Sequence, residues 1–173
     1  KKIIAFGASS SKNSINKKLA TYTASLFENA EVTVLDLNDF EMPLYSVDKE
    51  SSGFPKEAQA FLDALMEADV LIVSLAEHNG AYTAAFKNIL DWASRINGKV
   101  FQGKKMLLMA TSPGERGGAS VLEIAKDRFP RHDANLVGTF SLPSFYENFH
   151  EANGILNPDL KNKLLEIIKS IDL

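Results

Sequence analysis

Five short apolar runs alternate with segments of helical period along the chain, and this alternation is the feature that most limits its fold. The strongest run, Val70–Leu75, is almost wholly apolar, as expected of a strand buried on both faces. Strands that alternate with helices build a parallel, doubly wound α/β sheet. We predict strands over 3–6, 32–37, 70–75, 106–110 and 136–142, and helices over 14–28, 55–68, 82–96, 119–129 and from 157 to about 171.

The predicted elements fill one domain over residues 1–173, because no repeat, low-complexity tract or linker divides the sequence. Helix starts are expected at Ser14 and at Asn157, which precedes a proline. The connection over 38–54 is long for this architecture, and loops of that length often carry function.

Composition excludes several classes of protein. The net charge of -3 and the lack of a basic run argue against nucleic-acid binding. The absence of cysteine excludes disulfides, thiolate nucleophiles and iron–sulfur ligation. No apolar run is long enough to span a membrane and no signal peptide is visible, so we expect a cytoplasmic protein that does not bind membranes.

The loop after the first strand, residues 7–16, contains four serines and Lys12 and leads into a helix. Hydroxyl groups, unpaired backbone N–H groups and the helix dipole together favour a bound anion such as a terminal monophosphate. The loop has neither the Gly-Lys-Ser/Thr ending of a P-loop nor the three glycines of a dinucleotide fingerprint. Taken alone, the serines favour a polar surface loop with a helix cap over an anion site. Asp36 is interpreted as a strand-end or loop-capping residue.

Two further loops leave the same edge of the sheet, because the carboxyl ends of parallel strands lie together. The loop after Val70–Leu75 contains Glu77, His78 and the strong turn signal Asn79-Gly80. The loop after the fourth strand, residues 111–118, contains glycines that let backbone approach a ligand. An exposed loop histidine and a plain strand-to-helix turn are the alternatives for these two loops.

The order of these loops resembles that of the NADPH-dependent FMN reductase family. That family's first loop reads roughly Gly-Ser-x-Arg-x-x-Ser-x-Asn, its second reads Pro-Glu-Tyr-Asn-Gly, and a Leu-Lys-Asn-x-x-Asp-Trp helix follows. Residues 76–80 and 86–92 are similar to the second motif and the helix, and the likeness continues through 112–118 and 142–145. Ser11 stands at the arginine position, His78 at the tyrosine and Ala76 at the proline, and Lys12 supplies a nearby positive charge.

The resemblance implies a flavodoxin-like sheet of order 2-1-3-4-5, with helices on both faces. It implies an enzyme that binds FMN, takes hydride from NAD(P)H and passes electrons to a small-molecule acceptor, with no metal and no catalytic side chain. A homodimer or homotetramer is expected. A one-electron carrier and a non-catalytic flavin-binding module remain alternatives. The residues predicted to bind the cofactor are Ser9, Ser11, Ser14, Ile15, Asn16, Glu77, His78, Asn79, Gly80, Ser112, Gly114 and Gly117.

Three local predictions complete the sequence analysis. Ser14 and Asn16 are expected to cap the first helix beside the phosphate. The aromatic-rich run 145–149 suggests a subunit interface, although it could equally pack onto its own domain. The cluster of Glu147, His150 and Glu151 is interpreted as a solvated loop or a helix cap.

Overall fold

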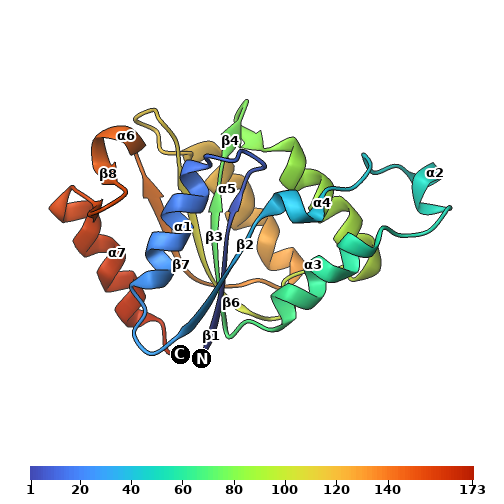
Figure 1. The fold of residues 1–173 in the computed structure, drawn as a ribbon, viewed down its shortest axis with the longest axis horizontal. Helices are drawn as coiled ribbons and strands as arrows, with labels where there is room; N and C mark the ends of the chain where they lie inside the picture. The colour runs from blue at the N-terminus through green and yellow to red at the C-terminus, as the bar shows by residue number, and fades with distance from the viewer.

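The computed structural model describes residues 1–173 and contains one five-stranded parallel sheet of order β2-β1-β3-β6-β7 (Figure 1). Numbered along the chain, these strands give the predicted order 2-1-3-4-5, so the flavodoxin-like prediction is confirmed. Their bounds are β1 (Lys2–Ala8), β2 (Glu31–Leu35), β3 (Val70–Leu75), β6 (Lys105–Thr111) and β7 (Asn135–Leu142).

Helices cover both faces of the sheet (Figure 1). The alternation of side chains along β1 shows the two layers: Ile3 and Ala5 belong to one apolar cluster, and Ile4 and Phe6 to the other. All six residues of β3 are buried, because the strand lies in the middle of the sheet. The helices are α1 (Ile15–Ser25) and α7 (Pro158–Ser170) on one face, with α3 (Lys56–Met66), α4 (Ala84–Ile96) and α5 (Ala119–Arg128) on the other.

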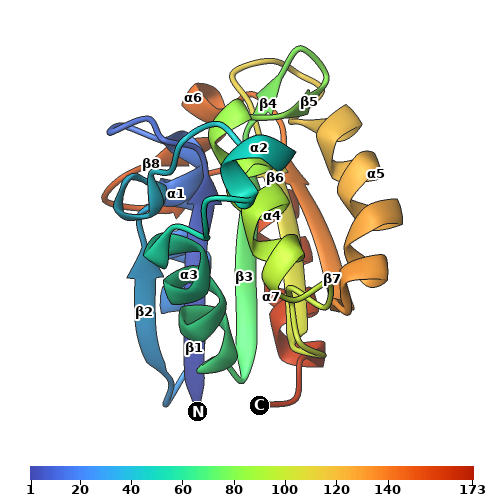
Figure 2. The same ribbon diagram turned by 90° about the vertical axis from the view of Figure 1, so that its right-hand side faces the viewer.

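Short helices and hairpins lie within the loops. Figure 2 shows β4, β5 and α6 at the end of the molecule opposite both termini. They lie where β1, β3 and β6 end, which is the edge predicted to carry the site. The short elements are η1 (Leu37–Phe40), α2 (Val47–Glu50), the hairpin β4 (Glu77–His78) and β5 (Ala81–Tyr82), η2 (Phe129–His132), α6 (Phe145–Asn148), and the hairpin β8 (Phe149–His150) and β9 (Gly154–Ile155).

The helix starts predicted at Ser14 and Asn157 are confirmed, since both side chains accept backbone N–H groups of the first turn. Most predicted boundaries differ from the observed ones by about one to three residues, and two of these differences have a local cause. The second strand ends at Leu35, because Asp36 accepts the Asn38 N–H and starts η1. The third helix begins at Ala84 rather than Tyr82, because Tyr82 pairs in the β4–β5 hairpin.

The aromatic run over 145–149 packs onto its own domain, so it gives little surface for the suggested interface. Phe145 and Phe149 are buried and stack on each other at 4.8 Å between ring centroids. Only Tyr146 of the three aromatic side chains is exposed, at 72%. Glu151 forms an ion pair with Lys18 at the surface, in keeping with the solvated loop predicted there.

No helix of this chain is long and apolar enough to cross a membrane.

Candidate functional site

The three predicted loops meet around one cavity of about 220 Å³ at the carboxyl ends of β1, β3 and β6, which we call the edge cavity. Loop residues separated by about a hundred positions in sequence therefore line one space. The predicted residues that line it are Ser9, Ser11, Ser14, Ile15, Asn16, Glu77, His78 and Ser112.

The β1–α1 loop presents hydrogen-bond donors to the edge cavity. Ser14 is buried and caps α1, because its Oγ accepts the Lys17 N–H at 3.1 Å. The N–H groups of Ile15 and Asn16 stand at the first helical positions, where no intrahelical acceptor exists, and no other group of the chain accepts them. α1 is an 11-residue helix that begins with free N–H groups and a serine hydroxyl. Such a helix start is suited to bind an anion.

Ser9 and Ser11 order the same loop. The Oγ of Ser9 accepts the Ser11 N–H at 3.1 Å, and the Oγ of Ser11 accepts the Asn13 N–H at 3.3 Å. Both hydroxyl groups act as acceptors in these turns, so each keeps its own proton for a ligand. The loop thus holds its shape without using the donors that an anion needs.

Asn16 does not cap α1, and the prediction that its side chain lies beside a phosphate in that role was wrong. Its Oδ1 accepts the Thr111 N–H at 3.0 Å and the Ser74 hydroxyl at 2.7 Å, and its Nδ2 donates to the Thr111 carbonyl at 3.1 Å. The buried amide therefore joins α1 to the ends of β3 and β6. Only the backbone N–H of Asn16 remains for a ligand.

The second loop is a tight hairpin. Asn79 and Gly80 both have positive φ, 52° and 75°, as a type I′ turn requires, which confirms the predicted turn. The carboxylate of Glu77 accepts the Val121 N–H at 2.7 Å and so caps α5, whose own N-cap is Gly118 and offers no side chain. Asn79 and Gly80 stand at the exposed tip and do not line the edge cavity.

The third loop is fastened to the end of β7. The Phe145 N–H donates to the Ser112 carbonyl at 3.0 Å, and the Ser144 N–H donates to the Gly114 carbonyl at 2.9 Å. Gly117 has φ of 58°, and a Cβ there would lie 2.9 Å from the Pro143 nitrogen. Gly117 is thus required by packing, and neither Gly114 nor Gly117 lines the edge cavity.

Sequence reasoning missed part of the lining. Asn13 and Ala76 flank the predicted motifs, and Thr111 and Pro113 flank Ser112, so proximity in sequence could have found them. Tyr146 comes from α6 and could not be found that way, because its run was interpreted as an interface. The missed lining residues are Asn13, Ala76, Thr111, Pro113 and Tyr146.

Lys17, in the first turn of α1, forms an ion pair with Asp36. The Lys17 ammonium lies 2.7 Å from the Asp36 carboxylate, and the hydrogen bond from Lys17, aided by the Asn38 N–H, lowers the pKa of Asp36 to about 2. Lys12 belongs to no ion pair and is exposed at the same loop. No group of three or more His, Asp or Glu side chains is placed to hold a metal ion.

Residues 1–147 match the family model of the NADPH-dependent FMN reductases. The chain belongs to this family. The resemblance found in the three loops is thereby confirmed, together with the flavin-dependent oxidoreductase class that it implies.

Two relatives of this chain are named as reductases of quinones. The chain is 38% identical to a 2-hydroxy-1,4-benzoquinone reductase of a Burkholderia species, over 62% of this chain and 58% of that protein. It is 32% identical to a quinone reductase of Escherichia coli strain K12, over 56% of this chain and 49% of that protein. The chain therefore covers 58% and 49% of the length of these two reductases, less than two thirds of either.

Among solved structures, the fold is similar to that of FerB, a flavoenzyme NAD(P)H:(acceptor) oxidoreductase from Paracoccus denitrificans. The TM-score is 0.77 and the identity 23%, covering 98% of this chain and 94% of that one. At this identity the likeness concerns the fold.

The edge cavity fits the phosphate-bearing end of FMN. A monophosphate needs several donors close together, and the loop offers the hydroxyl protons of Ser9, Ser11 and Ser14 with the free N–H groups of the first turn of α1. Only one donor-rich helix start of this kind borders the cavity, which suits a mononucleotide better than a dinucleotide.

Proposed function

We propose that this FMN reductase family member is a cytoplasmic NAD(P)H-dependent oxidoreductase that holds FMN in the edge cavity and passes electrons to small-molecule acceptors. The observation that carries the proposal is the meeting of a donor-rich helix start with the β3 and β6 loops around one space. When bound, FMN supplies the hydride chemistry, so the protein has to bind and orient it.

The proposal assigns the phosphate to Ser9, Ser11 and Ser14 and to the N–H groups of Ile15 and Asn16, with Lys12 adding positive charge. The remaining predicted residues act through the backbone and through shape. Glu77 holds the hairpin against α5, and Asn16 joins α1 to the ends of β3 and β6. His78 and Ser112 border the rest of the edge cavity. Asn79, Gly80, Gly114 and Gly117 lie outside its lining and are proposed to border the cofactor only where it extends beyond the cavity.

No side chain is proposed as catalytic. The edge cavity contains one histidine, His78, which is exposed and has no hydrogen-bonded orienting partner in the chain. The carboxylate of Glu77 is already committed to Val121. A reaction that the cofactor performs needs neither residue as acid or base.

The acceptor class follows from the open setting of the cavity. Its lining includes two exposed residues from separate elements, His78 of the β4–β5 hairpin and Tyr146 of α6. We infer a broad range of acceptors: quinones, free flavin, azo and nitro compounds, and metal oxyanions. Loops on a rigid scaffold set such ranges, and here the 38–54 segment, His78 and a second subunit are the expected determinants.

A steady-state panel tests this function. Menadione, a nitroaromatic compound, an azo dye, chromate and free FMN are compared with NADH and with NADPH as donor. We expect turnover with several unrelated acceptors at comparable kcat/KM. No turnover with any acceptor would contradict the oxidoreductase. An advantage of about a thousandfold for one acceptor, about 4 kcal/mol of transition-state binding, would contradict the broad range.

A further inference from the structure

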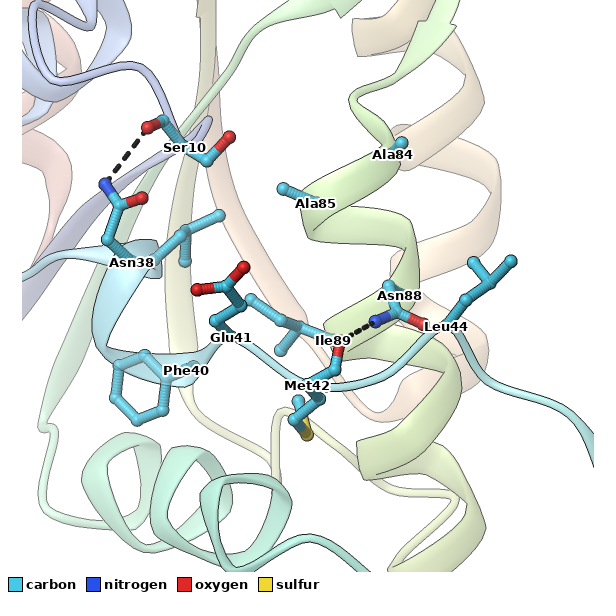
Figure 3. A pocket seen from close by; sticks show the side chains of 11 residues that line it. Ser10, Asn38, Phe40, Glu41, Met42, Leu44, Ala84, Ala85, Asn88 and Ile89 are labelled. Atoms are coloured by element: carbon cyan, nitrogen blue, oxygen red, sulfur yellow. Dashed lines mark hydrogen bonds between the residues drawn. The ribbon is translucent and has the colours of Figure 1, made fainter. Parts of the chain in front are cut away.

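A second cavity, of about 320 Å³, lies between the 37–44 segment and the first two turns of α4; we call it the side cavity (Figure 3). Its volume falls in the range of small-molecule sites. Much of the lining is apolar, with Leu37, Phe40, Met42 and Ile89 buried around it and Ala84 and Ala85 forming a wall of small side chains. An apolar wall of this kind favours a flat hydrocarbon or aromatic surface.

The side cavity is held in shape by two side chains of α4, Asn88 and Trp92, that form hydrogen bonds within the chain. The Nδ2 of Asn88 donates to the carbonyls of Met42 and Pro43, and its Oδ1 accepts the Tyr45 N–H at 2.8 Å. The indole N–H of Trp92 donates to the Pro43 carbonyl at 2.7 Å. The strap over 42–45 is therefore fixed against α4 before any ligand arrives, which lowers the entropy cost of binding.

Glu41 is the one ionisable side chain of the lining, and nothing in the chain pairs with it. No hydrogen bond and no ion pair engages its carboxylate, and no lysine or arginine lines the cavity. In Figure 3 the Glu41 carboxylate points into the space below Ser10 and Ala85. Asn38 donates to the Ser10 carbonyl at 3.0 Å, which leaves the Ser10 hydroxyl as a second polar group.

The start of α4 disfavours a positive ligand, because Ala84 is the first residue of this helix and helix starts favour anions. That end is partly satisfied, since Thr83 Oγ1 accepts the Phe86 N–H at 3.2 Å. A full negative charge on Glu41 outweighs the remaining half charge of the helix end. The net preference is for a positive group.

From this geometry we propose that the side cavity is a binding site for a planar aromatic molecule that carries an amidinium or ammonium group. The ring packs on the apolar wall of 37–44 and α4. The positive group is held by the Glu41 carboxylate, with the Ser10 hydroxyl beside it. Charge-assisted hydrogen bonds of this kind are the stronger ones in proteins.

This site is separate from the edge cavity, although the two share one loop. Ser9 and Ser11 line the edge cavity, whereas Ser10 lines the side cavity. The loop between them is tied to α4 by Thr83, whose Oγ1 donates to the Ala8 carbonyl at 2.8 Å. A ligand in the side cavity therefore leaves the proposed phosphate donors untouched.

The test is a titration of the whole protein with benzamidine, followed by backbone amide shifts in NMR spectra. We expect the shifts to gather at Ser10, Glu41, Ala84 and Ala85, and Glu41→Gln to weaken binding about three- to fivefold, as loss of an exposed ion pair does. Asp39→Asn is the matched control, because Asp39 and Glu41 are both exposed acidic residues of the same segment and only Glu41 lines the cavity. It should change affinity less than about twofold, as a screened surface charge does.

Three results would overturn the proposal. Unchanged benzamidine affinity in Glu41→Gln would show that the Glu41 carboxylate does not hold the positive group. Equal weakening in Asp39→Asn would reduce the effect to general surface charge. Benzoate shifting the same residues as strongly as benzamidine would show that the start of α4 sets the preference. Spectra of Glu41→Gln that match the parent away from the cavity show that the fold is kept, and saturating FMN should leave benzamidine affinity unchanged.

Discussion

At the scale of single residues, Ser14 combines a structural and a binding role. Its Oγ accepts the Lys17 N–H and caps α1, while its hydroxyl proton stays available at the edge cavity. The two roles use different parts of the same hydroxyl, so they can be separated by comparing ligands with and without a phosphate.

Ser14→Ala should weaken FMN binding by about 1–3 kcal/mol, the usual loss when a hydrogen bond to a charged group is removed. Riboflavin, which lacks the phosphate, should be nearly insensitive. Quenching of flavin fluorescence in a titration measures both. Ser46→Ala is the matched control, since Ser46 caps α2 in the same way through the Lys49 N–H but lies outside the edge cavity. Equal loss for FMN and riboflavin would make Ser14 purely structural.

Asp36 predicts a pH dependence of stability. Lys17 and the Asn38 N–H hold the folded pKa of Asp36 at about 2, below its usual 3.8. The carboxylate therefore contributes stability that is fully present above about pH 4 and is lost as pH falls through about 2. Both side chains are about a third exposed, so screening limits the contribution to about 1 kcal/mol or less.

Asp36→Asn keeps an acceptor for the Asn38 N–H and removes the charge. Urea unfolding from pH 6 to pH 2 should show the difference in stability between parent and variant shrinking as the pH drops below about 4. A difference that stays constant over this range would contradict the pair.

The sequence predicted which residues surround the site better than it predicted what each side chain does. Ser14 was predicted as a cap and is one, because a cap acts within its own helix turn. Asn16 and Glu77 were predicted to serve the cofactor directly, yet their side chains bind Thr111 and Val121. Those partners are 95 and 44 residues away, and single-sequence patterns carry no information on such contacts.

At the scale of elements, the close crossing of β1 and α1 depends on Gly7. A Cβ there would lie 2.7 Å from the Cα of Lys17 and 2.8 Å from the carbonyl carbon of Asn16, both of them backbone atoms. The glycine allows the first turn of α1 to lie against the end of β1, which is where the anion donors are.

Gly7→Ala should therefore push α1 away and destabilise the fold by about 1–3 kcal/mol, as overpacking does, with weaker FMN binding. Gly98→Ala is the control, because a Cβ at Gly98 meets nothing within 4 Å. Denaturant unfolding and FMN titration measure the two effects. If Gly7→Ala and Gly98→Ala behaved alike, the close crossing would not matter.

Strands made of continuous apolar residues were predicted well, whereas the boundaries beside short turns were predicted less well. Val70–Leu75 was predicted to the residue, since burial on both faces makes every residue of the strand apolar except Ser74. The predicted second strand ran two residues too far, to Leu37 in η1, and the predicted third helix began too early, at Tyr82 of the β4–β5 hairpin. The turn at Asn79-Gly80 was found because its residue types are specific to positive φ.

At the scale of the whole molecule, the parallel order of the sheet brings the three loops to one end, and Asn16, Thr83 and Glu77 tie them together. The order itself came from the family resemblance, since alternation alone leaves several doubly wound orders open. The side cavity could not be predicted, because the 38–54 segment has no periodic pattern to place it against α4.

Self-association as a homodimer or homotetramer is predicted at this scale. Large apolar side chains are exposed on the long connection, Leu44 at 76%, Val47 at 72% and Phe54 at 46%, and Tyr146 is exposed at the edge cavity. Sedimentation velocity at micromolar concentration should give a dimer or larger species. Val47→Asp should shift the distribution toward monomer, whereas a monomeric parent protein would refute the prediction.

The central claim is that bound FMN exchanges electrons with NAD(P)H, and anaerobic stopped-flow mixing tests it most directly. FMN-loaded protein is mixed with NADPH while the absorbance of oxidised flavin is followed. We expect bleaching within about a second, in line with ordinary enzyme turnover, and recovery of the absorbance when menadione is added. Bleaching that takes many minutes would contradict the claim and would indicate a flavin-binding protein that is a carrier or a store.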